Sequence, residues 1–168
     1  MTPLPLRTRI GIHTGTMTLG NLGTPERLDY TIIGPEVNLA SRLENVNKQY
    51  GTWTIVSEET FEAAGEGLLA RRMDRVRVIG IDRPVRLYEL IGLADDSTSV
   101  LREAFDLFAE GLSEFEARNW SGARTLFETV LRIYPTDGPA RVFVERCERF
   151  ERDGVRDSWD GVIALTEK

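Results

Sequence analysis

Short runs of β-branched and aliphatic residues, separated by turn-forming residues, occupy the first half of the chain. This pattern predicts strands, because alternating side chains suit a half-buried sheet. The predicted strands cover residues 7–13, 16–19, 30–33, 52–56, 75–81 and 85–91. Glycine, asparagine and proline favour turns, so residues 20–25 are predicted to form a loop and residues 82–84 a hairpin turn. A short helix, with Ser57 and Thr60 as candidate caps, is predicted over residues 57–64.

One longer helix is predicted between these strands. Pro35 can begin a helix and Gly51 can end it. Between them, an apolar stripe with helical spacing is formed by Leu39, Leu43, Val46 and Tyr50. At about 100° per residue, Asn38, Arg42 and Asn45 lie on another face, where they can meet a ligand or a partner.

The second half of the chain changes to apolar residues at intervals of three and four, which predicts amphipathic helices. The first helix carries Leu101, Phe105, Phe108, Leu112 and Phe115. A second helix follows from Trp120, and a third runs from Gly138 to Phe150. The polar end of the chain is predicted to be loosely docked. The chain therefore divides into a first unit at residues 1–92, a linker at 93–97, helices at 98–151 and a tail at 152–168.

The helical segment is similar in part to a tetratricopeptide unit, a helical repeat of about 34 residues. The matching positions of its second helix are Trp120, Ala123, Phe127, Val130 and Pro135. Gly111 also falls where the repeat has a small residue, whereas Glu114 occupies an aromatic position and Phe115 comes one place later. Arrays of this kind need roughly three or more repeats to bury their core. One unit plus one helix is therefore expected to pack on the first half of the chain or on a neighbouring molecule.

Composition narrows the class of protein. Hydrophobic residues make up 41% of the chain and charged residues 29%, as in soluble globular proteins. No stretch approaches the roughly 18 apolar residues of a membrane span, so we expect a cytoplasmic protein without membrane contact, either alone or as the cytoplasmic end of a larger membrane-anchored protein. The single cysteine, Cys147, excludes an intrachain disulfide.

The distribution of charge argues against nucleic-acid binding. The net charge is −6. Residues 1–92 hold 11 basic and 11 acidic side chains, and residues 93–168 hold 10 and 16. Neither half has the excess of positive charge that neutralises a phosphate backbone.

Four ordered blocks carry the strongest functional signal. They are Arg9-Ile-Gly-Ile-His-Thr-Gly15, Gly20-Asn-Leu-Gly23, Arg27-Leu-Asp-Tyr-Thr-Ile-Ile-Gly34 and Val37-Asn-Leu-Ala-Ser-Arg-Leu-Glu44. Together with a closing strand at residues 84–90, they resemble the catalytic domain of class III adenylate and guanylate cyclases over residues 7–91. The resemblance implies a partial ferredoxin-like α+β domain with a mostly antiparallel sheet and helices on one face. It also implies a dimer in which two protomers share each active site.

The resemblance implies roles for three residues in converting ATP to cyclic AMP and pyrophosphate. In this reaction the ribose 3′-oxygen attacks the α-phosphorus, and catalysis depends on positioning and on stabilising charge at phosphate oxygens. Asn38 would hold the ribose, and Arg42, one helical turn away, would meet the phosphates. Thr31 stands where the family recognises the purine, which favours ATP over GTP. Outside these blocks, the Asn-x-x-x-Arg pair would be read as a solvated helix face and Thr31 as an ordinary strand residue.

Two departures from the family pattern stand out. The family's opening strand and hairpin, with two metal-binding aspartates and an adenine-contacting lysine, have no counterpart in this sequence. The family is expected to use Mg²⁺ or Mn²⁺, yet no metal ligand is assigned here. Three aspartates outside the family's metal-binding contexts are predicted to be loop or surface carboxylates, namely Asp29, Asp74 and Asp82. Ile79-Gly80 replaces a Lys-Gly pair near the triphosphate, for which Arg77 or Arg83 would have to compensate.

The remaining motifs favour structural roles. His13 is the only histidine, and without a second histidine or a nearby cysteine it has few partners for a metal site. The glycines fit turns and close approaches, and neither a Gly-x-x-x-x-Gly-Lys-Ser/Thr nor a Gly-x-Gly-x-x-Gly motif occurs.

Two functions are therefore compatible with the sequence. The first is the C-terminal portion of a bacterial-type adenylate cyclase in intracellular signalling, acting as a homodimer or with a complementary cyclase half. As an isolated chain it is expected to be inactive, because the metal-binding strand is missing. The alternative is a non-catalytic cyclase-like scaffold or regulatory dimerisation module that binds protein partners through its helical segment.

Overall fold

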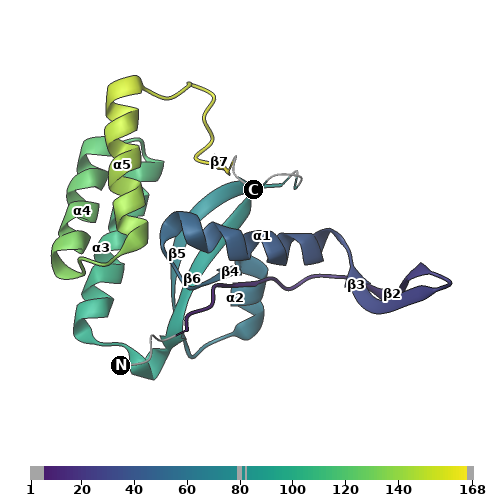
Figure 1. Ribbon diagram of the computed structural model, residues 1–168. Coiled ribbons are helices and arrows are strands. Elements are labelled where there is room, and N and C mark those ends of the chain that lie inside the picture. Colours follow the sequence, from purple (N-terminus) through teal and green to yellow (C-terminus); the bar gives the residue numbers. More distant parts are fainter. Residues whose placement is uncertain (1–5, 79–80, 82, 166–168) are drawn as a thin grey trace.

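The computed structural model describes residues 6–78, 81 and 83–165, which form an α+β fold (Figure 1). The first half contains β1 (Ile10–Ile12), β2 (Thr18–Thr24), β3 (Arg27–Ile33), α1 (Pro35–Tyr50), β4 (Thr54–Ser57), α2 (Glu58–Ala64), β5 (Leu68–Val78) and β6 (Val85–Leu93). The second half contains a 3₁₀ turn (Ala94–Asp96), α3 (Ser99–Glu116), α4 (Trp120–Ile133), α5 (Gly138–Asp153) and β7 (Ile163–Leu165). Within the described ranges, no helix combines the length and apolar character needed to cross a membrane.

The main sheet has five strands in the order β1-β4-β6-β5-β7. Its two inner pairs, β4 with β6 and β6 with β5, are antiparallel. Its two outer pairs, β1 with β4 and β5 with β7, are parallel. The prediction of a mostly antiparallel sheet is therefore wrong for the outer pairs. Each outer pair joins strands separated by long crossover segments, which permit parallel pairing but leave no local sequence signal.

Helices contact both faces of this sheet. The apolar stripe of α1 is buried in the same core as Val85 and Leu87 of β6. On α2, Phe61 stacks on Tyr88 with 4.2 Å between ring centroids. Because neighbouring strand residues point to opposite faces, Tyr88 projects away from the face that carries Leu87. The prediction that helices cover one face only is wrong, since α2 lies against the other face.

The strands β2 and β3 form a separate antiparallel hairpin that projects from the sheet (Figure 1). The predicted loop over residues 20–25 is wrong, because β2 continues through Thr24 and pairs with Arg27. Gly23 has a φ of 143°, and a Cβ atom there would stand 2.0 Å from the Arg27 carbonyl oxygen. The turn-forming residues thus lie at the narrow end of a hairpin. Hydrogen bonding between the two strands keeps the other residues of the segment extended.

Other local predictions are confirmed. Helix α1 begins at Pro35, and Gly51 caps it with a left-handed φ of 68°. The Ser57 hydroxyl accepts a hydrogen bond from the Thr60 amide at 3.3 Å and so caps α2. Strand β5 begins seven residues before the predicted start at residue 75. Register shifts at two places in β5 interrupt the alternating pattern that would have marked the strand.

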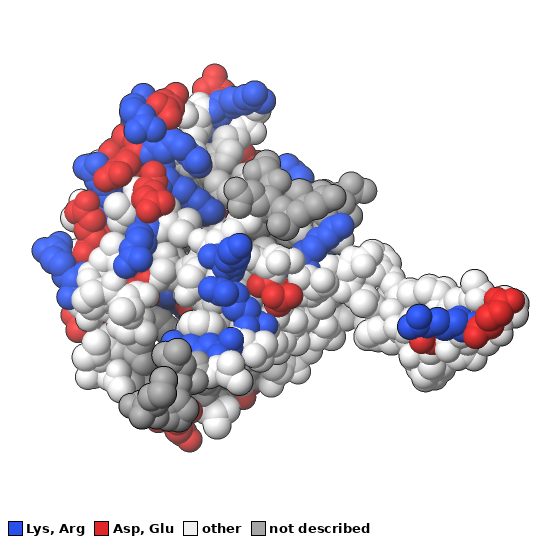
Figure 2. Space-filling model, in the orientation of Figure 1, with Lys and Arg blue, Asp and Glu red and all other residues white. Residues whose placement is uncertain are grey.

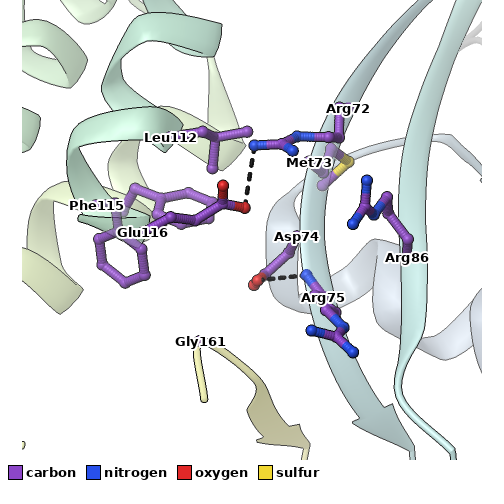
Figure 3. A pocket seen from close by; sticks show the side chains of 10 residues that line it. Arg72, Met73, Asp74, Arg75, Arg86, Leu112, Phe115, Glu116 and Gly161 are labelled. Carbon is purple, nitrogen blue, oxygen red and sulfur yellow. Dashed lines mark hydrogen bonds and ion pairs between the residues drawn. The ribbon is translucent and has the colours of Figure 1, made fainter. Parts of the chain in front are cut away.

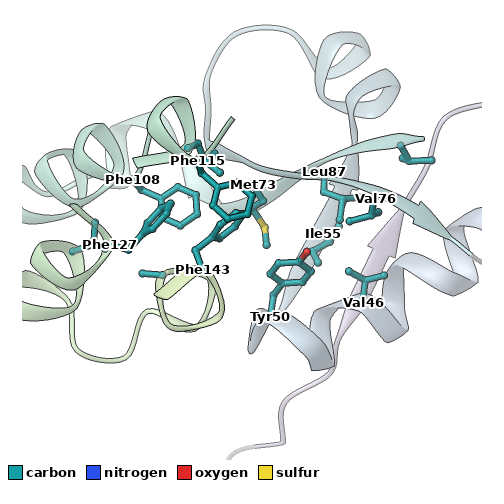
Figure 4. Close-up of a cluster of buried hydrophobic side chains, with 14 of the residues drawn as sticks. Val46, Tyr50, Ile55, Met73, Val76, Leu87, Phe108, Phe115, Phe127 and Phe143 are labelled. Atoms are coloured by element: carbon teal, nitrogen blue, oxygen red, sulfur yellow. The ribbon is translucent and has the colours of Figure 1, made fainter. Parts of the chain in front are cut away.

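The second half is a three-helix segment, as predicted, and it packs on the first half. Phe108 lies close to Phe127 of α4 and Phe143 of α5, with ring centroids 5.2 and 5.6 Å apart (Figure 4). At Gly111 of α3, a Cβ atom would stand 2.8 Å from the Phe127 ring, so glycine permits this close approach. One continuous buried cluster spans both halves, which confirms the expected packing on the first half. The likeness to a tetratricopeptide unit stays a prediction.

Two buried ionic groups join the halves. In the first group, Asp74 of β5 accepts hydrogen bonds from Tyr50 of α1 and Arg146 of α5. The Arg146 guanidinium also donates to the Tyr50 hydroxyl at 2.9 Å. Burial, together with the Asp74 charge, raises the pKa of the Tyr50 phenol well above its usual value, so the phenol stays protonated and donates. Asp74 was predicted to be a loop or surface carboxylate, and this is wrong because it lies buried in a strand.

The second buried group centres on Arg71 of β5. Its guanidinium lies 2.7 Å from a carboxylate oxygen of Glu89 on β6 and 2.7 Å from one of Asp137. Asp137 also caps α5 by accepting from the Ala140 amide at 2.7 Å. The cap therefore connects the start of α5 to the sheet.

The C-terminal segment is docked more firmly than predicted. Strand β7 pairs in parallel with the end of β5. Val162 is buried, and Trp159 lies against Phe115, Trp120 and Phe150 with ring centroids 5.5–5.8 Å away. The prediction of a loosely docked end is wrong for residues 159–165. Scattered apolar residues in a polar sequence find their partners only once the aromatic cluster has formed.

Candidate functional site

The polar face of α1 is the first component of the candidate site. Asn38 and Arg42 lie one turn apart, and α1 follows β3 directly through Gly34. Gly34 has a φ of 151°, and its carbonyl oxygen accepts from the Asn38 amide at 3.2 Å. Asn38 is exposed and Arg42 is half-buried. The amide side chain is therefore available to solvent at the start of the helix, and the guanidinium lies deeper.

The guanidinium of Arg42 has an unfulfilled hydrogen-bonding group. Its Nη1 atom is buried and makes no hydrogen bond within residues 6–78, 81 and 83–165. A buried charged donor without a partner costs free energy, because it has lost its hydrogen bonds to water and has gained none from the protein. An anionic oxygen placed against this side chain would satisfy the donor, and guanidinium groups suit phosphate oxygens especially well.

Thr31 occupies the hairpin rather than the body of the sheet. It lies on β3 directly opposite Gly20 of β2 and is half-buried. With five neighbours it lines a hollow of about 110 Å³, and these neighbours are Thr18, Gly20, Asn21, Leu22 and Ile33. The hydroxyl can donate and accept hydrogen bonds. Sequence reasoning missed Thr18 and Asn21 as neighbours of Thr31, because recognising them requires the register of the hairpin.

Two asparagines on α1 have different roles from the candidate pair. Asn45 was grouped with Asn38 and Arg42, but its side chain donates back to the Ser41 carbonyl at 3.5 Å. Asn47 is buried and donates to the Ile10 carbonyl of β1 at 2.9 Å. The sequence pattern did not mark Asn47, although its place on the buried side of the helix was a signal. It fastens α1 to the first strand.

His13 takes part in a compact polar cluster. Its Nδ1 lies 2.7 Å from the Ser57 hydroxyl and its Nε2 lies 2.5 Å from a Glu36 carboxylate oxygen. Arg83 pairs with Glu59 at 2.6 Å and lies 3.6 Å from Glu36. Burial alone would raise the pKa of Glu59, but hydrogen bonding by Arg83 and by nearby backbone and hydroxyl groups lowers it below its ordinary value. These contacts join the end of β1 to α1 and α2.

The charged residues weighed as replacements for the family's lysine and aspartates have other partners or positions in the structure. Arg83 is engaged by Glu59, and Arg77 lies 3.9 Å from Asp160. Asp29 is an exposed residue of strand β3, which confirms the predicted surface carboxylate. The predictions for Asp82 and for Ile79-Gly80 lie outside the described residues.

The described residues do not fit a metal site. Over residues 6–78, 81 and 83–165, histidine, cysteine, aspartate and glutamate side chains form no group of three or more that could hold a metal ion. A pair of divalent cations at transferring phosphates needs several carboxylate ligands. The described residues alone therefore assign no metal ligand.

Comparison with known proteins identifies the family of the first half. The sequence model of the adenylate and guanylate cyclase catalytic domain matches residues 2–92. An adenylate cyclase specific to terminal differentiation in Dictyostelium discoideum is 30% identical over 146 residues, which are 84% of this chain and 7% of that protein. Adenylate cyclase 1 of Rhizobium meliloti is 40% identical over 87 residues, 52% of this chain and 13% of that protein. The chain thus spans a small part of the curated relatives it matches.

Solved structures give similar matches. The adenylyl cyclase CyaB from P. aeruginosa is 39% identical, with a TM-score of 0.44 over 53% of this chain and 42% of that one. The guanylyl cyclase Cya2 is 31% identical, with a TM-score of 0.44 over 52% of this chain and 44% of that one. The family match itself covers more than half of the sequence. This chain therefore belongs to the adenylate and guanylate cyclase catalytic domain family.

Proposed function

We propose that the chain is the C-terminal part of an adenylate cyclase that converts ATP to 3′,5′-cyclic AMP and pyrophosphate at a dimer interface. The observation that carries the proposal is the Arg42 guanidinium, whose buried Nη1 lacks a hydrogen-bond partner in the described part of the chain. It stands one turn from the exposed Asn38, within the region matched by the family. In this proposal Arg42 stabilises negative charge on the phosphates as pyrophosphate leaves.

Asn38 and Thr31 complete the proposed substrate contacts. Asn38 would hold the ribose so that its 3′-oxygen points at the α-phosphorus, which lowers the barrier by fixing the reacting atoms. Thr31 would contact the purine, and its position in a hollow of about 110 Å³ supports a contact with one edge of the ring. The preference for ATP over GTP rests on this residue, because a hydroxyl can both donate to and accept from adenine.

The proposal assigns the metal ligands to a second polypeptide segment. The described residues offer no carboxylate group of the kind that would hold Mg²⁺ or Mn²⁺. Strand β1 forms one edge of the main sheet, and its Ile10 and Ile12 are exposed. An unpaired edge with apolar side chains can accept a further strand. A complementary cyclase half would dock there.

The first test is reconstitution. The purified chain with ATP and Mg²⁺ or Mn²⁺ is expected to form no cyclic AMP, and addition of a cyclase fragment with the metal-binding strand is expected to restore turnover. Cyclic AMP is measured by chromatography, and GTP in a parallel reaction tests the purine preference. Turnover by the chain alone would contradict the need for a second segment. Failure of every complementary fragment to restore turnover would favour the non-catalytic scaffold.

The proposed dimer has a candidate contact on the projecting hairpin. Its exposed apolar side chains are Leu19, Leu22, Leu28, Tyr30, Ile32 and Ile33. On the face shown in Figure 2, the hairpin is largely uncharged apart from a few side chains near its end. Exposed apolar groups of this number on a small element favour burial against a partner. We assign the partner as a second cyclase-like chain, because the hairpin also carries Thr31 and a shared site would lie beside it.

Substitution of the cross-strand pair Leu19 and Ile32 by serine is expected to weaken this association by about tenfold or more, because the lost apolar burial lowers the association free energy. Sedimentation velocity over a range of concentrations measures the monomer–dimer equilibrium. Asp29→Asn, a polar change on the same hairpin, serves as the control and should leave the equilibrium unchanged. A chain that remains dimeric after the double substitution would place the interface elsewhere.

The alternative function is that of a regulatory scaffold, and one observation supports this alternative. The alignment with the Dictyostelium cyclase covers 146 residues, more than the region matched by the family, so it includes part of the helical segment. A segment retained beside a cyclase domain would bind protein partners or transmit a signal. Reconstitution separates the two functions, because a scaffold gives no turnover with any complementary half.

A further inference from the structure

A second polar cleft lies where the two halves of the chain meet. It has a volume of about 420 Å³, which is large enough for a small organic ligand. The residues that line it are Arg75, Arg86, Glu116, Arg118, Trp159, Asp160 and Gly161. We call it the junction cleft. Its inner end continues between β5, β6 and α3, where Arg75 and Arg86 lie opposite Glu116 (Figure 3).

Two arginines on neighbouring strands of the sheet line this cleft. Arg75 of β5 and Arg86 of β6 are direct cross-strand partners. Like charges in this position repel and destabilise a sheet. Arg86 lies 3.4 Å from Glu58, but no carboxylate in residues 6–78, 81 and 83–165 lies within ion-pair distance of the Arg75 guanidinium. The pair is therefore undercompensated, and an anion between the two guanidinium groups would remove the repulsion.

A third arginine adds positive charge from the helical side. Arg118 follows α3 with a left-handed φ of 64°, and its guanidinium donates to the carbonyl oxygens of Asp157 and Trp159, both at 2.9 Å. These bonds hold the C-terminal segment as a wall of the cleft. A guanidinium has five N–H donors, so others stay available.

The carboxylates of the cleft are paired with cations other than Arg75, Arg86 and Arg118. Glu116 accepts from Arg72 at 3.0 Å. Asp160 accepts from the Val162 amide at 3.1 Å and lies 3.9 Å from Arg77. They therefore do little to neutralise Arg75 and Arg118. The local balance of charge stays positive in a molecule whose net charge is −6.

We propose that the junction cleft binds a phosphate-bearing small molecule, with a phosphate group between Arg75 and Arg86 and within reach of Arg118. Guanidinium groups bind phosphate oxygens through paired, charge-assisted hydrogen bonds. This site is distinct from the proposed substrate site, which lies on α1 and the hairpin. Because β5, β6, the end of α3 and the C-terminal segment all contribute, bound ligand fastens the helical segment to the cyclase-like half.

The test measures the binding of pyrophosphate and of AMP to the full chain by titration calorimetry, in the presence of a chelator. Arg75→Glu creates an ion pair with Arg86, so it is expected to weaken binding by about tenfold or more and to raise the melting temperature of the free chain. Arg132→Gln, on the exposed side of α4, is the matched control and should leave both quantities unchanged. Equal binding of the two probes means that the phosphate alone is recognised, and tighter binding of AMP means that the organic part also makes contacts.

Three outcomes would overturn the proposal. The first is that the native chain binds neither probe. The second is that Arg75→Glu binds the probes as tightly as the native chain does, and the third is that Arg42→Ala abolishes binding. The last result would assign the anion to the proposed substrate site instead. Conversely, binding that persists in Arg42→Ala but is lost in Arg75→Glu would support the junction cleft as the binding site. That result would not depend on whether the chain is a cyclase.

Discussion

Replacement of Arg42 by alanine is expected to lower the rate of cyclic AMP formation by the reconstituted enzyme about 100-fold or more, the range found when one donor to a developing charge is removed. The substitution deletes the guanidinium whose buried Nη1 has no other hydrogen-bond partner in the described residues. Because no internal contact of that nitrogen is lost, the fold should tolerate the change. The loss should appear mainly in kcat, since the charge on the phosphates grows in the transition state.

Asn45→Ala is the matched control for this experiment. Asn45 lies on the same helix and the same polar side, but its side chain bonds to its own helix at Ser41. Its removal should leave turnover within about twofold of the unsubstituted enzyme, as for surface changes away from a site. An unchanged rate for Arg42→Ala, measured under saturating ATP, would contradict the proposed phosphate contact and transfer the role to another cation.

Replacement of Arg146 by alanine is expected to destabilise the chain by about 3 to 5 kcal/mol, the usual cost of removing one partner of a buried ion pair. Asp74 would then be a buried carboxylate without a cationic partner, with the Tyr50 hydroxyl and the Arg75 amide as its remaining hydrogen-bond donors. For a chain of this size the melting temperature should fall by roughly 10 °C. Calorimetry or circular dichroism measures both quantities.

Two further variants separate charge from packing in this group. Asp74→Asn combined with Arg146→Met removes both charges while keeping most of the side-chain volume, so much of the lost stability should return. Arg149→Ala changes an exposed arginine of the same helix and should have little effect. If Arg146→Ala melts like the native chain, the Asp74–Tyr50–Arg146 group adds little to the stability of the contact between the halves.

The sequence anticipated much of the candidate site because its geometry is local. Asn38 and Arg42 share a helix, and spacing along a helix fixes their common face whatever the helix packs against. The limits of α1 and the capping of α2 by Ser57 are likewise set by neighbouring residues. The amphipathic pattern marked α3, α4 and α5 for the same reason.

Contacts between residues that are far apart in the sequence could not be predicted from local patterns. Asp74 was assigned to the surface because its partners, Tyr50 and Arg146, stand 24 and 72 positions away. Likewise, the composition of residues 20–25 indicates a loop until β3 supplies cross-strand hydrogen bonds. A polar residue in a sequence window has no visible partner, so its burial depends on contacts that the window does not contain.

The sequence by itself determined the family, the helices and the spacing of the proposed substrate contacts, since each depends on residues close together in the chain. Only the tertiary structure decided the mixed sheet, the docking of the C-terminal segment and the junction cleft. In that cleft, Arg75 and Arg86 are neighbours through strand register, and Arg118 joins the lining through the packing of α3 beside β5. Such charge clusters arise from pairing and packing over long sequence separations, which no local pattern records.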